Sequence, residues 1–248
     1  MLGSTVSIAC PNIMLNTIIA DALCGFADEL EKASDFDAAL TKLIRKTVKE
    51  HKRIVFNGNN YSEEWVVEAE KRGLLNLRST PDALALYTTD ANVALFEKYG
   101  VFSKTEVYSR YEIQLENYFK QVHIEALAMA DMIKKDILPA TCSYMKDLSK
   151  EAINKQQLSA DISCELEIAL LKKLSSLSSD LYHKMGKLEE SIAEGKEFKD
   201  VLDEAKYYRN TVFSLMEETR ATADEIETLV GEKYWPYPTY GDLLFSVM

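Results

Sequence analysis

Apolar residues recur at every third or fourth position along the second half of the chain, which is the spacing of one face of an α-helix. The first such stretch opens with the residues of a capping box, Ser103 and Glu106, and contains no proline or glycine before Pro139. We therefore expect one helix over residues 103–138, which Pro139 kinks or ends, and a polar helix that continues toward Asn154.

Two more long helices are predicted on either side of Gly195, over residues 160–194 and 197–230. The second of them alternates three- and four-residue steps between apolar positions from end to end, as a coiled-coil seam does. The turn at Gly195 is so short that the chain has to return antiparallel. The sequence thus predicts a helical hairpin and, with the helix over residues 103–138, a bundle of at least three long helices.

The chain up to about residue 101 consists instead of short helices separated by turn and capping residues. An amphipathic helix is expected from Asn12 to about Lys32, and a second helix opens at Ser34. Three further short helices are expected, with starts at Ser62, Thr80 and Thr89 and with glycine stops at Gly73 and Gly100.

The two ends of the chain do not follow a helical pattern. Residues 3–9 alternate as a strand does, although no partner strand precedes them. Residues 1–9 are therefore expected to be extended but unpaired, poorly ordered, or paired with another copy. Residues 234–245 combine two prolines with many aromatic side chains, so we expect a non-helical tail that packs along the bundle or against another part of an assembly.

These elements define an all-α fold class. Short helices are followed by an antiparallel bundle of at least three long helices, with a short strand-like N-terminal stub and an extended aromatic C-terminal tail. The predicted domains are residues 1–101, the short-helix region, and residues 102–248, the long-helix bundle with its tail. The content of 9 Gly and 5 Pro in 248 residues agrees with this class, because a sheet protein needs more turn residues.

The formal net charge of −11 narrows the range of partners. So acidic a chain has no basic surface for nucleic acid and is repelled by an anionic membrane. We also expect no secretory signal and no apolar run near the roughly 18 residues that span a bilayer. The composition therefore predicts a cytoplasmic protein with no nucleic-acid and no membrane partner, whose four widely spaced cysteines are buried free thiols.

Patterns of catalytic or metal-binding residues are sparse. The sequence contains no paired Cys or His at zinc spacing, no glycine-rich phosphate loop and no nucleophile elbow. A di-iron bundle needs two Glu-x-x-His motifs, and only Asp180 and His183 come near that spacing. The residues by themselves favour an interaction or assembly module without a metal site, and a cryptic metal site at Asp180 and His183 stays a further hypothesis.

Five segments, in order along the chain, resemble the C-terminal region of type III glutamine synthetase, the long-chain bacterial form. They are GSTVSIACPNIMLNTIIADAL, EHKRIVFNGNNYSEEW with AEKRGLLNL, ALFEKYGVFSKTEVYSRYEIQLENY, RATADEIETLV and WPYPTYGDLLF. The resemblance covers essentially the whole chain. It departs locally at Cys10, where the family is expected to have a small residue, often glycine.

The resemblance implies what the whole enzyme does. It would ligate ammonia to the γ-carboxylate of glutamate with ATP, through γ-glutamyl phosphate, at Mg²⁺ or Mn²⁺ ions held by glutamates in a barrel-like funnel. Its partners would be other subunits of a ring-shaped homo-oligomer, with active sites between neighbours. In this family the metal-binding glutamates, the ATP-binding loops and the substrate-binding arginines lie upstream, so the resemblance implies no catalytic residue, cofactor or metal on this chain.

Three residues near the N-terminus are weak candidates for the edge of that active-site funnel: Ser4, Ser7 and Asn12. The resemblance places them directly after the last catalytic strand of the family. The simpler interpretation is that the two serines are ordinary loop or strand residues and that Asn12 caps the first helix.

Two functions remain open at this stage. The first is the C-terminal portion of a glutamine synthetase, which contributes packing and oligomer contacts and is inactive alone. The alternative is a stand-alone acidic helical scaffold that binds another protein through its aromatic tail. The strand-like start also leads us to expect a cut edge at Met1, because the catalytic segments implied by the resemblance would precede it.

Overall fold

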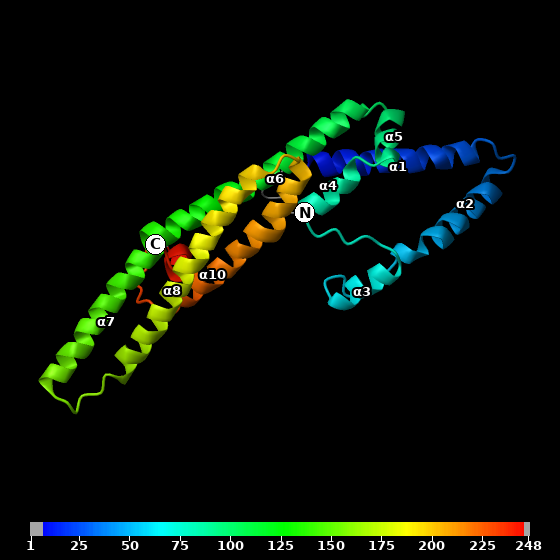
Figure 1. The fold of residues 1–248 in the computed structure, drawn as a ribbon. Coiled ribbons are helices and arrows are strands. Elements are labelled where there is room, and N and C mark those ends of the chain that lie inside the picture. The colour runs from blue at the N-terminus through cyan, green and yellow to red at the C-terminus, as the bar shows by residue number, and fades with distance from the viewer. Residues whose placement is uncertain (1–6, 246–248) are drawn as a thin grey trace. The chain divides into compact units, whose positions relative to one another are not determined.

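A computed structural model, described here for residues 7–245, confirms the all-α class, and the described residues contain no strand. Its α-helices are α1 (Ala9–Leu30), α2 (Phe36–His51), α3 (Glu63–Lys71), α4 (Thr80–Tyr87), α5 (Asp90–Lys98), α6 (Lys104–Met132), α7 (Leu138–Leu158), α8 (Glu165–Glu194), α9 (Val201–Tyr207), α10 (Phe213–Glu227) and α11 (Tyr240–Phe245). Two 3₁₀ turns, η1 (Lys52–Ile54) and η3 (Gly195–Glu197), and two π-helical turns, η2 (Ile133–Ile137) and η4 (Tyr208–Val212), complete the described elements (Figure 1).

The chain divides into two compact units, Met1–Tyr111 and Glu112–Met248. The division falls inside α6, so the first unit holds α1 to α5 with the start of α6, and the second holds the remaining elements. The domain boundary predicted after residue 101 stays a prediction.

Capping residues set the helix starts of the first unit, although some caps differ from those predicted. The capping box before α6 is confirmed, because the Ser103 amide donates to Glu106 Oε2 (2.8 Å) and the Glu106 amide donates to Ser103 Oγ (3.3 Å). The predicted caps of α2 and α4 are wrong by one residue, since Asp35 and Ser79 accept the capping hydrogen bonds. The local sequence pattern therefore predicts the presence of a helix more accurately than it predicts the residue that caps it.

The first helix begins earlier than predicted. α1 starts at Ala9, and its N-cap position is Ile8, so the prediction of Asn12 as an N-cap is wrong. Part of the expected extended stub is consequently helical, and residues 1–6 lie outside the described residues. α1 is also long and apolar enough to cross a membrane by length and composition, which contradicts the prediction that no segment reaches that length. That test is weak evidence, because core helices of soluble proteins and signal sequences also pass it.

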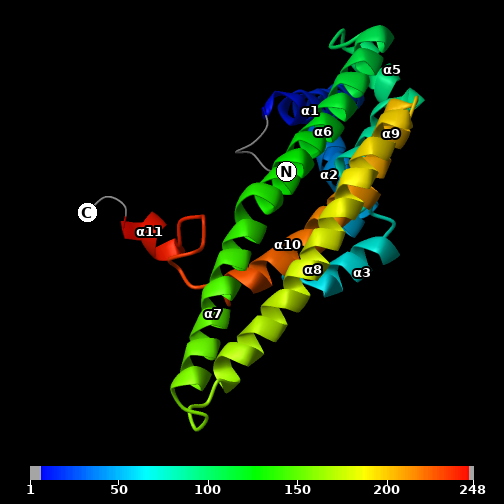
Figure 2. The same ribbon diagram turned by 60° about the vertical axis from the view of Figure 1, so that its left-hand side comes forward.

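Three helices form the bundle of the second unit. α8 packs against both α7 and α10, and the close turn at Gly195 returns the chain antiparallel, so the predicted hairpin is confirmed. Figures 1 and 2 show these helices lying side by side from two directions. The helix after Gly195 starts later than predicted, because Asp200 caps α9 by accepting from the amides of Leu202 and Asp203.

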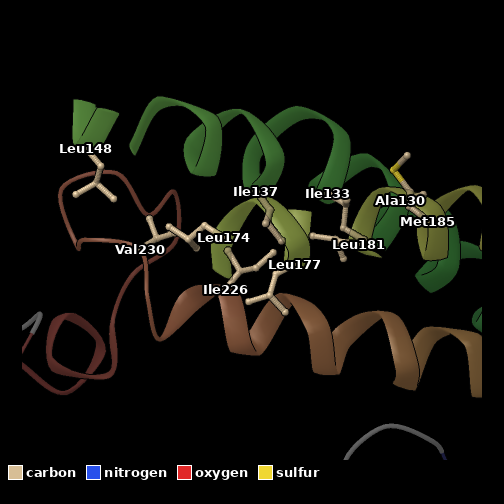
Figure 3. Close-up of a cluster of buried hydrophobic side chains, with 10 residues drawn as sticks. All are labelled: Ala130, Ile133, Ile137, Leu148, Leu174, Leu177, Leu181, Met185, Ile226 and Val230. Atoms are coloured by element: carbon tan, nitrogen blue, oxygen red, sulfur yellow. The ribbon is translucent and has the colours of Figure 1, made fainter. Parts of the chain in front are cut away.

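The predicted apolar stripes of the long helices meet in one core. Figure 3 shows this cluster: Ala130, Ile133, Ile137, Leu148, Leu174, Leu177, Leu181, Met185, Ile226 and Val230. A second cluster continues toward the Gly195 turn and contains Val122, Ala126, Leu188, Ile192, Tyr208, Val212 and Met216. Burial of these aliphatic and aromatic side chains is the main source of bundle stability.

Two π-helical turns interrupt the α-helical register. In η2 the Leu138 amide donates to the Ile133 carbonyl, directly before Pro139, whose ring cannot be accommodated in a regular α-helical turn. The proline thus distorts the helix without ending it. After η4, Met216 is buried and the neighbouring Leu215 is half-buried, whereas Thr219, Thr222 and Ile226 further along α10 are buried.

A buried carboxylate on α8 forms an ion pair with α7 across the turn that joins the two helices. Glu167 is 4% exposed and accepts a hydrogen bond from Lys155, whose ammonium group also contacts Glu151 (3.1 Å). The Lys155 hydrogen bond, followed by the Glu167 backbone amide, lowers the pKa of Glu167 below its ordinary value of 4.5.

This shift predicts an acid-dependent loss of stability. Because the folded-state pKa is lowered, the contribution of Glu167 is full above about pH 4.5 and decreases as the pH falls toward the folded-state pKa. We expect Glu167→Gln to reduce the acid slope of the free energy of unfolding, measured by urea denaturation between pH 3 and 6. The control is Glu165→Gln, an exposed neighbour on α8. Equal slopes for the two variants would contradict the assignment.

The aromatic tail packs against the bundle, as predicted, but it is not extended throughout. The Tyr234 hydroxyl donates to Asp147 (2.8 Å) and the Tyr237 hydroxyl donates to Asp136 (3.0 Å). Burial first, and then the Asp136 hydrogen bond, raises the pKa of Tyr237 to about 12. After Thr239 the chain forms α11, which corrects the prediction of a non-helical tail. Figure 2 shows α11 to the side of α7.

Candidate functional site

Two of the three residues proposed for the edge of an active site, Ser7 and Asn12, lie at the start of α1. Ser7 Oγ accepts from the Ala9 amide (3.2 Å), which is a helix-start interaction. Asn12 lies exposed in the first turn of α1, and its amide donates to the Ile8 carbonyl. Ser4 is outside the described residues. The two described candidates therefore have local roles at the start of α1, and a role at an active-site edge stays a prediction.

The Asp180 and His183 pair is engaged in other contacts. Asp180 binds Lys184 (2.8 Å) and accepts from the Thr222 hydroxyl (3.0 Å) of α10, and the His183 ring meets the edge of Tyr182. Over residues 7–245, no three His, Cys, Asp or Glu side chains are arranged so that they could hold a metal ion. The described donor set thus does not fit a metal such as Mg²⁺ or Mn²⁺, and we derive no step through a metal or ATP on this chain.

A buried polar pair lies where α6 meets η4. His123 Nδ1 and the Tyr208 hydroxyl are 2.8 Å apart, and Tyr208 is 1% exposed. Burial, with a smaller effect of Lys196, lowers the pKa of His123. Near this pair, burial and then the charge of Glu116 raise the pKa of Glu204. Nothing in the sequence indicated that His123 and Tyr208 would be in contact, because 85 residues separate them.

The cysteines are free, but only one of them is buried. Cys164 is buried, Cys10 is half-buried, and both Cys24 and Cys142 are exposed. The prediction of four buried thiols is therefore correct for Cys164 alone.

A shallow depression lies on the surface of the second unit. An open depression of about 340 Å³ lies between the end of α10 and the tail, lined by Glu227, Val230, Glu232, Trp235 and Thr239. Enclosed small-molecule sites usually bury most of their ligand, which an open depression of this kind does not do.

A set of exposed apolar side chains lies on α1 and α2. We call this set the α1–α2 apolar surface; its residues are Leu15, Ile18, Ile19, Leu23, Phe36, Ile44 and Val48, each more than half exposed. The helical patterns that predict α1 and α2 include Ile18, Leu23, Phe36, Ile44 and Val48 but not Leu15 and Ile19, although the spacing of Leu15 and Ile19 from Ile18 and Leu23 also follows a helical period.

Comparisons with known proteins agree on one family. Residues 39–157 match the model of the glutamine synthetase C-terminal domain. The chain is 45% identical over 206 residues to a glutamine synthetase of Butyrivibrio fibrisolvens, which covers 83% of the chain and 29% of that relative. It is 32% identical over 252 residues to a type-3 glutamine synthetase of Dictyostelium discoideum, with 98% of the chain and 34% of the relative covered.

A third relative extends the same pattern. A glutamine synthetase of Bacteroides fragilis (strain YCH46) is 28% identical over 252 residues, with 98% of the chain and 35% of the relative covered. The chain therefore spans about a third of the length of the curated relatives it matches.

Proposed function

Because this chain belongs to the glutamine synthetase family and matches its C-terminal region, we propose that it is the packing and assembly region of a cytoplasmic glutamate–ammonia ligase. In this proposal the rest of the enzyme performs the ATP-dependent ligation of ammonia to glutamate, and this chain contributes no catalytic step. Its partners are the catalytic part and the other subunits of a homo-oligomeric ring.

One observation carries the proposal. The α1–α2 apolar surface exposes large aliphatic and aromatic side chains, while the predicted site residues Ser7 and Asn12 make only local contacts at a helix start. Exposed apolar clusters on soluble proteins mark surfaces that bind other protein surfaces. The binding of ATP and of Mg²⁺ or Mn²⁺ is accordingly assigned to the part of the enzyme that this chain does not include.

We expect the purified chain to form no glutamine alone. The assay measures phosphate release that depends on ATP, glutamate and ammonia together, with Mg²⁺ or Mn²⁺ supplied. The expected rate equals that of a blank without protein, because the described residues hold no group of three His, Cys, Asp or Glu side chains that could bind the metal ions of this reaction. Sustained release that requires all three substrates would overturn the assignment of catalysis to the missing part.

The alternative, a stand-alone helical scaffold, is favoured by α11. Leu243, Leu244 and Phe245 on this short helix are each more than 60% exposed, while Tyr234 and Tyr237 hold the preceding tail to the bundle. A chain that stays monodisperse and does not associate with the catalytic part of a relative would favour the scaffold. Size-exclusion chromatography of the chain alone, and of the chain mixed with that catalytic part, makes this comparison.

A further inference from the structure

α1 leaves an apolar face exposed on the side opposite to its packed residues. The packed side carries Ile13, Thr17 and Asp21, which are buried or half-buried within the first unit. The exposed side presents Leu15, Ile18, Ile19, Ala22 and Leu23, and each of its large side chains is more than half exposed. Their spacing of i, i+3, i+4, i+7 and i+8 is that of a helix which places one side against a protein core.

Among residues 7–111 of the first unit, none buries this exposed face of α1. Thr17 is the buried residue of α1, and Leu43 is the buried residue of α2. The two helices diverge from the turn that joins them (Figure 1), so the exposed side chains of α2, Phe36, Ile44 and Val48, do not cover those of α1. The exposed apolar residues of α1 follow one another at helical spacing on a single face, and this differs from the single exposed leucines found on any protein.

Two kinds of occupant could cover such a helix, a membrane or a protein. A bilayer is disfavoured by Asp21, which lies in the middle of α1, binds the Lys98 ammonium (2.7 Å) and accepts from the Tyr99 hydroxyl (2.9 Å). A membrane-spanning α1 would take this charged pair into the hydrocarbon layer at a high cost. α1 contains no Lys or Arg, and the net charge of −11 repels anionic lipid. The charges therefore favour a protein.

We propose that the α1–α2 apolar surface is the docking face for the part of the glutamine synthetase polypeptide that this chain does not include. This inference rests on the proposed function and adds the place of contact to it. About two thirds of each curated relative's length lies outside the matched segment, so a large protein body is available to cover the surface. Docking through α1 would enclose its exposed face and leave the Asp21–Lys98 pair within the first unit, where it already is.

The test is a hybrid polypeptide in which this chain replaces the matched 34% of the Dictyostelium discoideum enzyme, a match that covers 98% of the chain. Ala22→Cys places a thiol on the exposed face of α1, and native Cys142, exposed on α7, is the internal control. Labelling by a maleimide is followed by peptide fragmentation for the hybrid and for the chain alone. We expect the thiol introduced by Ala22→Cys to react at least about tenfold more slowly in the hybrid, and Cys142 to react equally in both.

Two matched substitutions locate the contact. Ile19→Asp places a charge in the proposed face, and Ile124→Asp places the same charge at an exposed isoleucine of α6. In the hybrid, Ile19→Asp is expected to return the reactivity at position 22 to that of the chain alone, whereas Ile124→Asp leaves it protected. Equal protection with both, or no protection in the unsubstituted hybrid, overturns the docking face. Because Ile19 and Ile124 are exposed in this chain, its thermal midpoint should not fall with either change.

A flotation experiment with vesicles tests whether the surface binds a membrane instead, and the activity of the hybrid separates a failure of the docking face from a failure of the proposed function. The chain alone is mixed with phosphatidylcholine vesicles and with vesicles that also contain phosphatidylglycerol, and flotation is measured. Flotation that Ile19→Asp abolishes would assign the surface to a membrane and overturn the proposal. An active hybrid with an unprotected thiol at position 22 refutes the docking face but leaves the proposed function intact. A protected thiol at position 22 in a hybrid that forms no glutamine supports the docking face and refutes the proposed function.

Discussion

Leu181→Ala is expected to lower the free energy of unfolding of the bundle by about 2–5 kcal/mol, the range found when a fully buried leucine is truncated. Leu181 is completely buried in the cluster of Figure 3, where it lies among side chains from α6, η2 and α10. Truncation removes apolar area from the core and leaves a cavity that rigid helices on both sides cannot close.

The control for Leu181→Ala is Leu166→Ala, on the same helix. Leu166 is 67% exposed, so its truncation should change the free energy of unfolding by no more than about 0.5 kcal/mol. Urea denaturation followed by far-ultraviolet circular dichroism measures both, and the m-value should stay unchanged. Similar midpoints for the two variants would mean that Leu181 does not belong to the core.

Gly195→Ala is expected to destabilise the bundle by about 1–3 kcal/mol through overpacking. The backbone of Gly195 has an ordinary helical φ of −55°, so strain in the main chain is not the cause. A Cβ atom at this position would lie 2.8 Å from the Cε2 and hydroxyl oxygen of Tyr208. The Tyr208 ring has little room to retreat, because it stacks on Phe119 and contacts His123 on the opposite helix.

Gly186→Ala, inside α8, is the control and is expected to stabilise the bundle. No atom lies within 4 Å of a Cβ built at Gly186, which is inside α8. Alanine there should raise the free energy of unfolding by about 0.5–1 kcal/mol, because it reduces the entropy of the unfolded chain and favours the helix. Thermal and urea denaturation of both variants measure these changes in the free energy of unfolding. If the two alanines have the same effect, the contact between Gly195 and Tyr208 does not hold the hairpin.

Local features of the sequence were sufficient for most of the helical architecture. The capping box Ser103–Glu106 begins α6, glycines at positive φ follow α3 and α5, and Gly195 lies at the hairpin turn. These signals act within a few residues of each other, so they operate in the same way in any tertiary context. Family membership was also readable from the sequence, because it depends on the order of residues and on no contact between helices.

The helical register after a π-turn and the pairing of side chains between helices could not be predicted from local sequence features. The π-turn η4 interrupts the α-helical register, and Met216 rather than Leu215 is buried directly after it. The hydrogen bonds of Tyr208 with His123 and of Tyr237 with Asp136 join residues 85 and 101 positions apart. Such pairs exist only after the helices have packed, since a periodic pattern specifies a face but not the neighbour that it meets.

The sequence by itself determined that α1 is helical, apolar and part of a glutamine synthetase C-terminal region. Only the tertiary structure decided which of its apolar residues are enclosed: Thr17 is buried, while Leu15 and Ile19 remain exposed. The physical reason is that apolarity is a property of a side chain, whereas burial depends on which other surface reaches it and removes it from water.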